Sequence, residues 1–121
     1  MTTVLIADDN TDMLDLIADT LEMNGFGVVK ASNGDEAWKI ISSMENLQNL
    51  VILSDVHMPK LNGFELLQRV RNNHRWPYIP VLLMSGDHND HIRALEADAD
   101  DFVLKPFRVE TLQAKLITVS S

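Results

Sequence analysis

The chain has 121 residues, of which 18 are acidic and 10 are lysine or arginine, so its formal net charge is −8. A surface of this sign repels phosphate backbones and anionic lipid headgroups, which argues against direct nucleic-acid binding and against membrane association. The absence of cysteine excludes disulfides, thiolate zinc sites and cysteine nucleophiles. No secretory signal and no apolar run of roughly 18 residues is visible, so we expect a cytoplasmic protein.

Five short apolar runs predict buried β-strands, because each is too short for a helix and rich in branched side chains. In chain order they cover residues 4–7, 28–31, 51–54, 81–84 and 102–104. Each run is followed by apolar residues at helical spacing, which predicts five helices. The fourth helix is expected near residues 88–97. Arg71 is expected on the solvated face of the third helix. The five apolar stripes are Leu14, Ile17, Ala18 and Leu21; Ala37, Ile40, Ile41 and Met44; Leu66, Leu67 and Val70; Ile92 and Leu95; and Val109, Leu112 and Leu116.

Strands that alternate with helices form a parallel sheet through right-handed crossovers, with helices on both faces. The uniformly apolar runs agree, since parallel strands are buried on both sides. The chain contains no internal linker, repeat or low-complexity tract, so residues 1–121 are interpreted as one α/β domain. The sequence does not decide whether this domain stands alone or is a segment of a longer protein.

Groups suited to holding a metal and a phosphoryl group stand where four of the five predicted strands end. In an open parallel sheet these ends share one edge, and ligands bind there where the strand order reverses. Proline cannot continue a strand, so Pro59 ends the third one and leaves the Asp55 carboxylate at its tip. The residues at the five ends are Asp8 and Asp9, Ser32 and Asn33, Asp55, Ser85, and Lys105.

The charges at this edge do not balance. Asp8, Asp9 and Asp55 bring three negative charges, and Lys105 returns one positive charge. Two carboxylates about 4 Å apart repel by roughly 4 kcal/mol at an effective dielectric constant near 20, so the group needs a further cation. Oxygen ligands with bound waters suit Mg²⁺. A carboxylate can accept a phosphoryl group, and we predict transfer to Asp55 with Ser85 bonding a phosphoryl oxygen.

Four motifs follow one another at a distinctive spacing. They are the run that ends in Asp8-Asp9; Asp55-Val56-His57-Met58-Pro59 with Asn62-Gly63 behind it; Leu83-Met84-Ser85-Gly86; and Phe102-Val103-Leu104-Lys105-Pro106-Phe107. In these motifs, and over almost its whole length, the chain resembles the receiver domains of two-component response regulators. The resemblance implies a flavodoxin-like three-layer sandwich, with a five-stranded parallel sheet in the order 2-1-3-4-5 and five helices.

The resemblance also implies a metal centre and a phosphoacceptor. Asp55 corresponds to the phosphoacceptor and is also one of the metal ligands, and Asp8 and Asp9 correspond to the acids that bind Mg²⁺ directly or through water. The backbone carbonyl of His57 resembles the one that completes the metal shell. Lys105 matches the lysine that pairs with the phosphoryl group, and its bond to the following proline is expected to be cis.

Other positions of the resemblance concern switching. Ser85 matches the hydroxyl that moves toward the phosphoryl group, and Phe102 stands where the family has its switch aromatic. His57 and Asp87 occupy positions that tune the lifetime of the phosphoryl group. Asp98 replaces a glycine that is common in the family, and we expect it to adopt the same left-handed turn.

By this resemblance the protein is a phosphorylation-dependent signalling switch rather than an enzyme with an external substrate. A sensor histidine kinase or a phosphotransfer protein would phosphorylate Asp55, changing the surface around the fourth helix, the fifth strand and the fifth helix. A homodimer through that surface is one expected outcome. The sequence names neither the kinase nor the downstream effector or output domain.

Several alternatives stay open at this point. A metal-dependent phosphohydrolase would need His57 or Asp87 as an acid for the leaving group. A docking module would keep the fold without the switch, and a flavin site is disfavoured because Asp8 and Asp9 repel a cofactor phosphate. Simpler structural interpretations also exist. They are a helix-capping cluster at 8–10, a plain core aromatic at Phe102, surface histidines at His88 and His91, and packing roles for Trp38 and Trp76.

Overall fold

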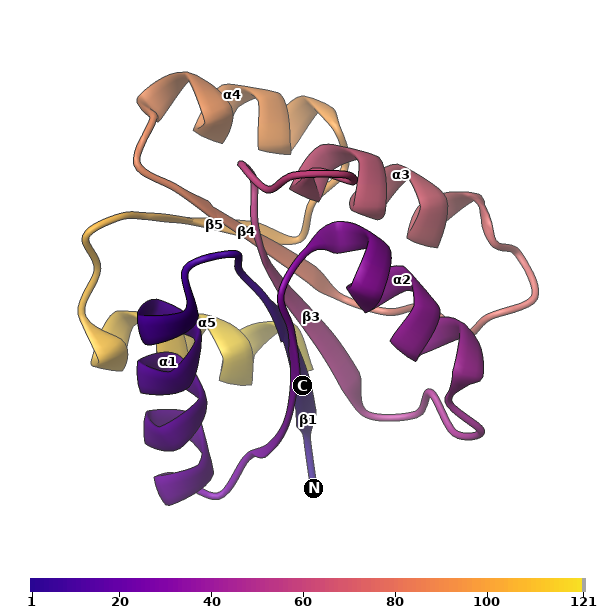
Figure 1. Cartoon of the computed structure of the whole chain (residues 1–121), viewed down its shortest axis with the longest axis horizontal. Coiled ribbons are helices and arrows are strands. Elements are labelled where there is room, and N and C mark those ends of the chain that lie inside the picture. The colour runs from indigo at the N-terminus through magenta and orange to yellow at the C-terminus, as the bar shows by residue number, and fades with distance from the viewer. Residues whose placement is uncertain (121) are drawn as a thin grey trace.

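Five parallel strands form one sheet in the order β2-β1-β3-β4-β5 in the computed structural model, which describes residues 1–120 (Figure 1). Every neighbouring pair of strands is parallel. The predicted α/β fold and the strand order implied by the resemblance are therefore confirmed. The elements are β1 (Thr3–Ala7), α1 (Thr11–Met23), β2 (Gly27–Ala31), α2 (Gly34–Ser43), β3 (Leu50–Asp55), α3 (Gly63–Asn72), β4 (Val81–Ser85), α4 (His88–Glu96), β5 (Asp101–Leu104) and α5 (Val109–Ser120).

Helices cover both faces of the sheet, with α1 and α5 on one face and α2, α3 and α4 on the other (Figure 1). Successive strand residues point to opposite faces, so the same strands fill both cores. In β1, Val4 and Ile6 pack with α1 and α5, whereas Leu5 and Ala7 pack with the other three helices. This double burial is the reason that the central strands are apolar at almost every position.

The edge strand β2 departs from the predicted uniform burial. Every residue of β3 and β4 is buried, but Ala31 is the only buried residue of β2. An edge strand has a neighbouring strand on one side only, so part of its surface stays in contact with water. Lys30 lies on this exposed part of β2 and forms an ion pair of 3.0 Å with Asp15 of α1.

Side-chain caps begin four of the helices that follow the strand ends. Asn10, Asn33 and Asn62 each accept a backbone N–H from the first turn of α1, α2 and α3, and Asp87 does so for α4. At α3, Glu65 completes a capping box. The caps fix where each helix begins after its strand-end loop, which has two or three residues before α1, α2 and α4 and seven before α3.

The buried face of α4 differs from the predicted one. Ile92 and Leu95 are 60% and 64% exposed, so the prediction that they face the core is wrong. The helix instead buries Asp90 and Ala94, one turn apart. Ala94 joins the hydrophobic core, and Asp90 is held by hydrogen bonds to Ser85 at the end of β4 and to His57 in the loop after β3. A polar anchor thus decides the rotation of this helix, and a search for apolar stripes does not detect such an anchor.

Arg71 on α3 is also more buried than predicted, because its side chain is 16% exposed. Its guanidinium group donates to the backbone oxygen of Asp98 and pairs with Asp100 at 2.7 Å. Asp100 accepts further hydrogen bonds from the Val81 backbone and the Tyr78 hydroxyl. Burial and the bond to Asp100 raise the pKa of Tyr78 to about 12. This network joins the starts of β4 and β5, at the edge opposite the strand ends.

Two expected backbone features are confirmed. Asp98 has a φ of 69°, in the left-handed region, and the bond between Lys105 and Pro106 is cis. Within residues 1–120, no helix combines the length and the apolar character that crossing a membrane requires.

Candidate functional site

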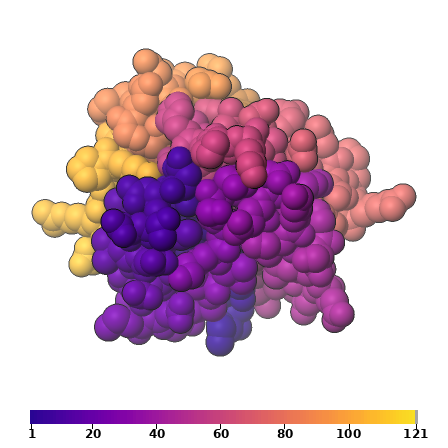
Figure 2. Space-filling view, in the orientation of Figure 1, coloured from indigo at the N-terminus to yellow at the C-terminus, as the bar shows by residue number. Residues whose placement is uncertain are grey.

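Three carboxylates meet at the edge where the parallel strands end, and we call them the acid cluster. Asp8 and Asp9 follow β1, Asp55 ends β3, and one oxygen of each lies within 4.8 Å of the others. Asp8 is 1% exposed and Asp55 is 8% exposed, whereas Asp9 is open to solvent. On the surface, N-terminal residues in indigo lie beside magenta and yellow segments at the upper left of Figure 2. The topology therefore assembles this site from distant parts of the chain.

Lys105 follows β5 and reaches two members of the acid cluster. Its Nζ lies 3.3 Å from Oδ2 of Asp8 and 3.4 Å from Oδ1 of Asp55. The lysine side chain is only 23% exposed, so water screens these ion pairs less than it screens surface pairs. This one ammonium group does not balance the three carboxylates of the acid cluster, so the site has an excess of negative charge.

The surroundings of Asp55 disfavour its charged form. Burial raises the pKa of the Asp55 carboxyl, and the nearby Asp8 carboxylate adds to this effect. The Lys105 ammonium acts in the opposite direction, but the pKa remains above its ordinary value. A further cation beside Asp55 would stabilise its ionised form.

The acid cluster fits Mg²⁺. This ion prefers an octahedron of oxygen ligands at about 2.1 Å, which puts neighbouring and opposite oxygens about 3 to 4 Å apart. The separations within the acid cluster, none above 4.8 Å, are compatible with such a shell. The exposure of Asp9 leaves room for the waters that Mg²⁺ usually retains. His57 lies in the loop after β3, and the role of its carbonyl as a ligand stays a prediction.

The loop after β3 returns so close to Asp55 that residue 63 has to be glycine. A Cβ atom at Gly63 would lie 2.5 Å from the backbone oxygen of Asp55. The Gly63 N–H also donates to the backbone oxygen of Val56 at 2.9 Å. In the Asn62-Gly63 motif, Asn62 caps α3, and Gly63 allows the helix to begin against the end of β3.

Ser85, Asp90 and His57 form a second group, which we call the Asp90 network. The Ser85 hydroxyl donates to Oδ2 of Asp90 at 2.6 Å and accepts the Asp87 N–H at 3.1 Å. The same carboxylate oxygen lies 2.7 Å from Nε2 of His57, and Arg93 lies 3.4 Å from the other oxygen. Asp90 is 2% exposed. The sequence did not predict a role for Asp90, because this residue stands in a polar stretch. The one signal was its position as an acid in the first turn of a helix.

The Asp90 network keeps its carboxylate ionised. Burial favours a higher pKa for Asp90, but the hydrogen bonds from Ser85 and His57, together with the charge of Arg93, outweigh it and lower the pKa. The start of α4 adds a favourable dipole for a negative charge. Asp90 is therefore a satisfied buried anion, unlike Asp55.

Comparison with known proteins identifies the family. The chain matches the family described as "Response regulator receiver domain" over residues 4–117. The chain belongs to this family. The receiver domain is 35% identical over 116 residues to the transcriptional regulatory protein CpxR of Escherichia coli, covering 96% of this chain and 48% of CpxR. It is 33% identical over 119 residues to the chemotaxis protein CheY1 of Helicobacter pylori, covering 96% of this chain and 94% of CheY1.

A solved structure gives the same result for the fold. The chemotaxis response regulator CheY4 of Vibrio cholerae superimposes with a TM-score of 0.86 at 30% identity, covering 98% of each chain. The receiver domain spans about half the length of CpxR and nearly all of CheY1. Membership of the family implies phosphorylation-dependent signalling, and receiver domains generally bind Mg²⁺ and are phosphorylated by histidine kinases.

Phe102 of this receiver domain belongs to the core and is 4% exposed. Its ring stacks on that of His91, with 4.9 Å between the centroids. Its role as a switch aromatic stays a prediction, as do the roles of His57 and Asp87 in phosphoryl lifetime. Within residues 1–120, the acid cluster is the one group of three or more potential metal ligands, so His88 and His91 are not part of such a group.

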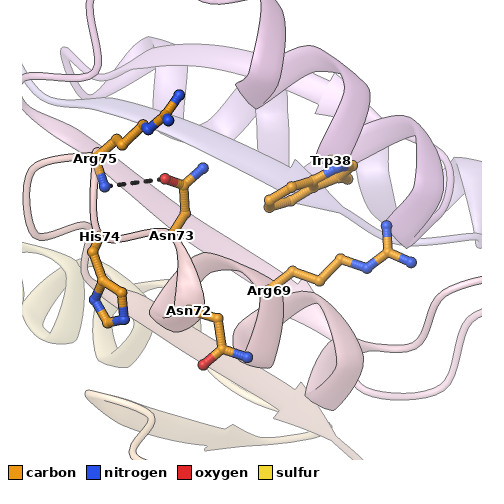
Figure 3. Close-up of a pocket in the computed structure, with 6 residues that line it drawn as sticks. All are labelled: Trp38, Arg69, Asn72, Asn73, His74 and Arg75. Atoms are coloured by element: carbon orange, nitrogen blue, oxygen red, sulfur yellow. Dashed lines mark hydrogen bonds between the residues drawn. The ribbon is translucent and has the colours of Figure 1, made fainter.

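A groove of about 490 Å³ lies at the C-terminal end of α3, between Trp38, Arg69 and residues 72–75. In Figure 3 Arg69 extends beside the Trp38 ring, whereas Arg75 and His74 point to other sides. These cationic groups diverge and form no common anion site. Trp38 also packs against Trp76 with 5.0 Å between the ring centroids, which confirms the packing role predicted for both.

Proposed function

We propose that this receiver domain is a signalling switch that accepts a phosphoryl group on Asp55 from a histidine kinase or phosphotransfer protein in the presence of Mg²⁺. The observation that carries the proposal is the acid cluster with Lys105 at one edge of the sheet. In this proposal the chain catalyses only its own phosphorylation and dephosphorylation.

Asp55 is the nucleophile of the proposed reaction. One of its carboxylate oxygens attacks the phosphorus of the donor phosphohistidine, so that a P–O bond forms and the P–N bond breaks, with the electron pair remaining on the imidazole. Asp8 and Asp9 would hold Mg²⁺, which would supply positive charge to the phosphoryl oxygens. The Lys105 ammonium, 3.4 Å from Asp55, pairs with another of these oxygens. The Ser85 hydroxyl donates to a third.

The proposed signalling surface consists of α4, β5 and α5. Ile92 and Leu95 on α4 support it, because both apolar side chains are more than half exposed. Covering such side chains with a partner removes apolar area from water. The expected partners are an output domain, a separate effector or a second copy of the chain. The absence of direct nucleic-acid binding and the cytoplasmic location also stay predictions.

The contacts of two residues favour the switch over a phosphohydrolase. A hydrolase would use His57 or Asp87 to protonate the leaving group. Nε2 of His57 is bonded to Asp90, and the Asp87 carboxylate accepts the Asn89 N–H as the cap of α4. The complete set of acids, hydroxyl and lysine likewise favours the switch over a docking module.

Intact-mass spectrometry after incubation with acetyl phosphate and Mg²⁺ tests the proposal. We expect one added phosphoryl group on the wild type and none on Asp55→Asn or in the presence of EDTA. Asp12→Asn makes the same substitution at an exposed carboxylate in the first turn of α1 and is expected to keep the label. Labelling of Asp55→Asn would contradict the assigned acceptor. Turnover of small phosphate esters beyond one equivalent would support the hydrolase instead.

A further inference from the structure

The Ser85 hydroxyl has no hydrogen-bonding capacity to spare for a phosphoryl group. A hydroxyl carries one proton, and Ser85 donates it to Asp90 at 2.6 Å. Its oxygen already accepts the Asp87 N–H. An ionised phosphoryl oxygen only accepts hydrogen bonds, so Ser85 cannot bond to it without leaving Asp90.

We propose that Asp90 is a positioning residue, which holds the Ser85 hydroxyl in the unphosphorylated state and competes with the phosphoryl group for its proton. The inference rests on the proposed function, since it assumes that a phosphoryl group on Asp55 recruits Ser85. It adds a residue on α4 that opposes activation.

The release of Ser85 does not leave Asp90 without partners. Oδ2 of Asp90 keeps His57 at 2.7 Å, and Oδ1 keeps Arg93 at 3.4 Å. A buried carboxylate that lost all its donors would be strongly destabilised, whereas one that loses a single donor remains tolerable. The Asp90 network can therefore exchange the serine while the fold stays intact.

The Asp90 network also joins three segments that surround the site. Ser85 ends β4, His57 lies two residues after Asp55, and Asp90 lies in the first turn of α4. Movement of the serine hydroxyl toward Asp55 removes one of the bonds that hold the start of α4. The exchange thereby couples the chemistry at β3 to the helix that carries Ile92 and Leu95.

A double-mutant cycle read by beryllofluoride binding tests the role of Asp90. Calorimetric titrations at saturating Mg²⁺ would compare the wild type, Asp90→Ala, Ser85→Ala and the double variant. We expect Asp90→Ala to tighten binding about tenfold, because a hydrogen bond to a carboxylate no longer has to be broken. In the Ser85→Ala background the same change is expected to have no effect. Asp90→Asn, which retains a weaker acceptor, is expected to tighten binding less.

Glu96→Gln is the matched control, because it removes one negative charge from the other end of α4. Its beryllofluoride affinity should equal that of the wild type. Equal tightening by Asp90→Ala in both backgrounds, or none in either, would overturn the role of Asp90 while the proposed function stands. A wild type that binds no beryllofluoride would overturn the proposed function and this inference together.

A measurement on the wild type keeps the inference testable if Asp90→Ala fails to fold. The ¹³C signal of the Asp90 carboxylate reports the hydrogen bond from Ser85. We expect this signal to shift on saturation with Mg²⁺ and beryllofluoride in the wild type, but much less in Ser85→Ala. An unchanged Asp90 signal in the saturated wild type would show that Ser85 keeps its bond and would refute the proposed competition.

Discussion

The acid cluster and the Asp90 network occupy neighbouring parts of one sheet edge, but their charges are balanced differently. The acid cluster has one lysine for three carboxylates, and burial raises the pKa of Asp55. Asp90 is less exposed than Asp55, yet hydrogen bonds from Ser85 and His57 and the charge of Arg93 lower its pKa. The first group is suited to receive a cation and a phosphoryl group, whereas the second is already satisfied. Charge balance, rather than the number of acids, therefore distinguishes the reactive centre from the anchor beside it.

Removal of Lys105, the cation that pairs with Asp8 and Asp55, is expected to have the largest effect on stability. Lys105→Met leaves Asp8 and Asp55 buried without an opposite charge, and breaking a buried ion pair costs about 3 kcal/mol of unfolding free energy. Urea denaturation in EDTA measures this loss, and Mg²⁺ should recover part of it. Equal stability of variant and wild type in EDTA would show that the acid cluster does not need the lysine.

Asp90→Ala is expected to lower the free energy of unfolding by about 2 kcal/mol at neutral pH, because it leaves the buried Ser85 hydroxyl without its acceptor. Since the pKa of Asp90 is lowered in the folded state, its stabilising effect is present above the ordinary aspartate pKa and disappears as the pH falls through the folded value. The difference from wild type in urea denaturation should therefore shrink below about pH 4. A difference that grows on acidification would contradict this assignment.

A side chain at position 63, which would crowd the end of β3, is expected to have the next largest effect on stability. Gly63→Ala places a Cβ against the Asp55 backbone and is expected to cost about 1 to 3 kcal/mol, with slower labelling by acetyl phosphate. Gly86→Ala is the matched control, because its added Cβ meets nothing within 4 Å. Thermal denaturation and a labelling time course of both variants measure these effects. Similar losses in both would point to a general cost of replacing glycine.

The smallest effect is expected from neutralising the phosphoacceptor. The raised pKa of Asp55 means that its contribution to stability is full below the ordinary aspartate pKa and is lost as the pH rises through the folded value. Asp55→Asn should therefore be slightly more stable than the wild type at pH 7 in EDTA, with little difference at acidic pH. Thermal denaturation at both pH values checks this, and Mg²⁺ should narrow the gap at pH 7. A less stable Asp55→Asn at pH 7 would indicate that Lys105 already satisfies the carboxylate.

The acid cluster was predictable because its members stand at the ends of strands. Apolar runs locate the strands, and a parallel sheet brings their ends to one edge, so Asp8, Asp55 and Lys105 meet whatever the details of packing. No comparable rule predicts which residues form the Asp90 network. Whether a polar residue of α4 faces solvent or Ser85 depends on how the helix is rotated, and the exposed Ile92 and Leu95 show that the apolar pattern pointed to the wrong face.

The sequence by itself determined the alternation of strands and helices, the residues at the sheet edge and their excess of negative charge, because these follow from local periodicity and chain order. Tertiary structure alone decided the rotation of α4, the burial of Arg71 and the partner of the Ser85 hydroxyl. These depend on hydrogen bonds that side chains make to residues of other elements and loops, and such bonds leave no periodic trace in the sequence.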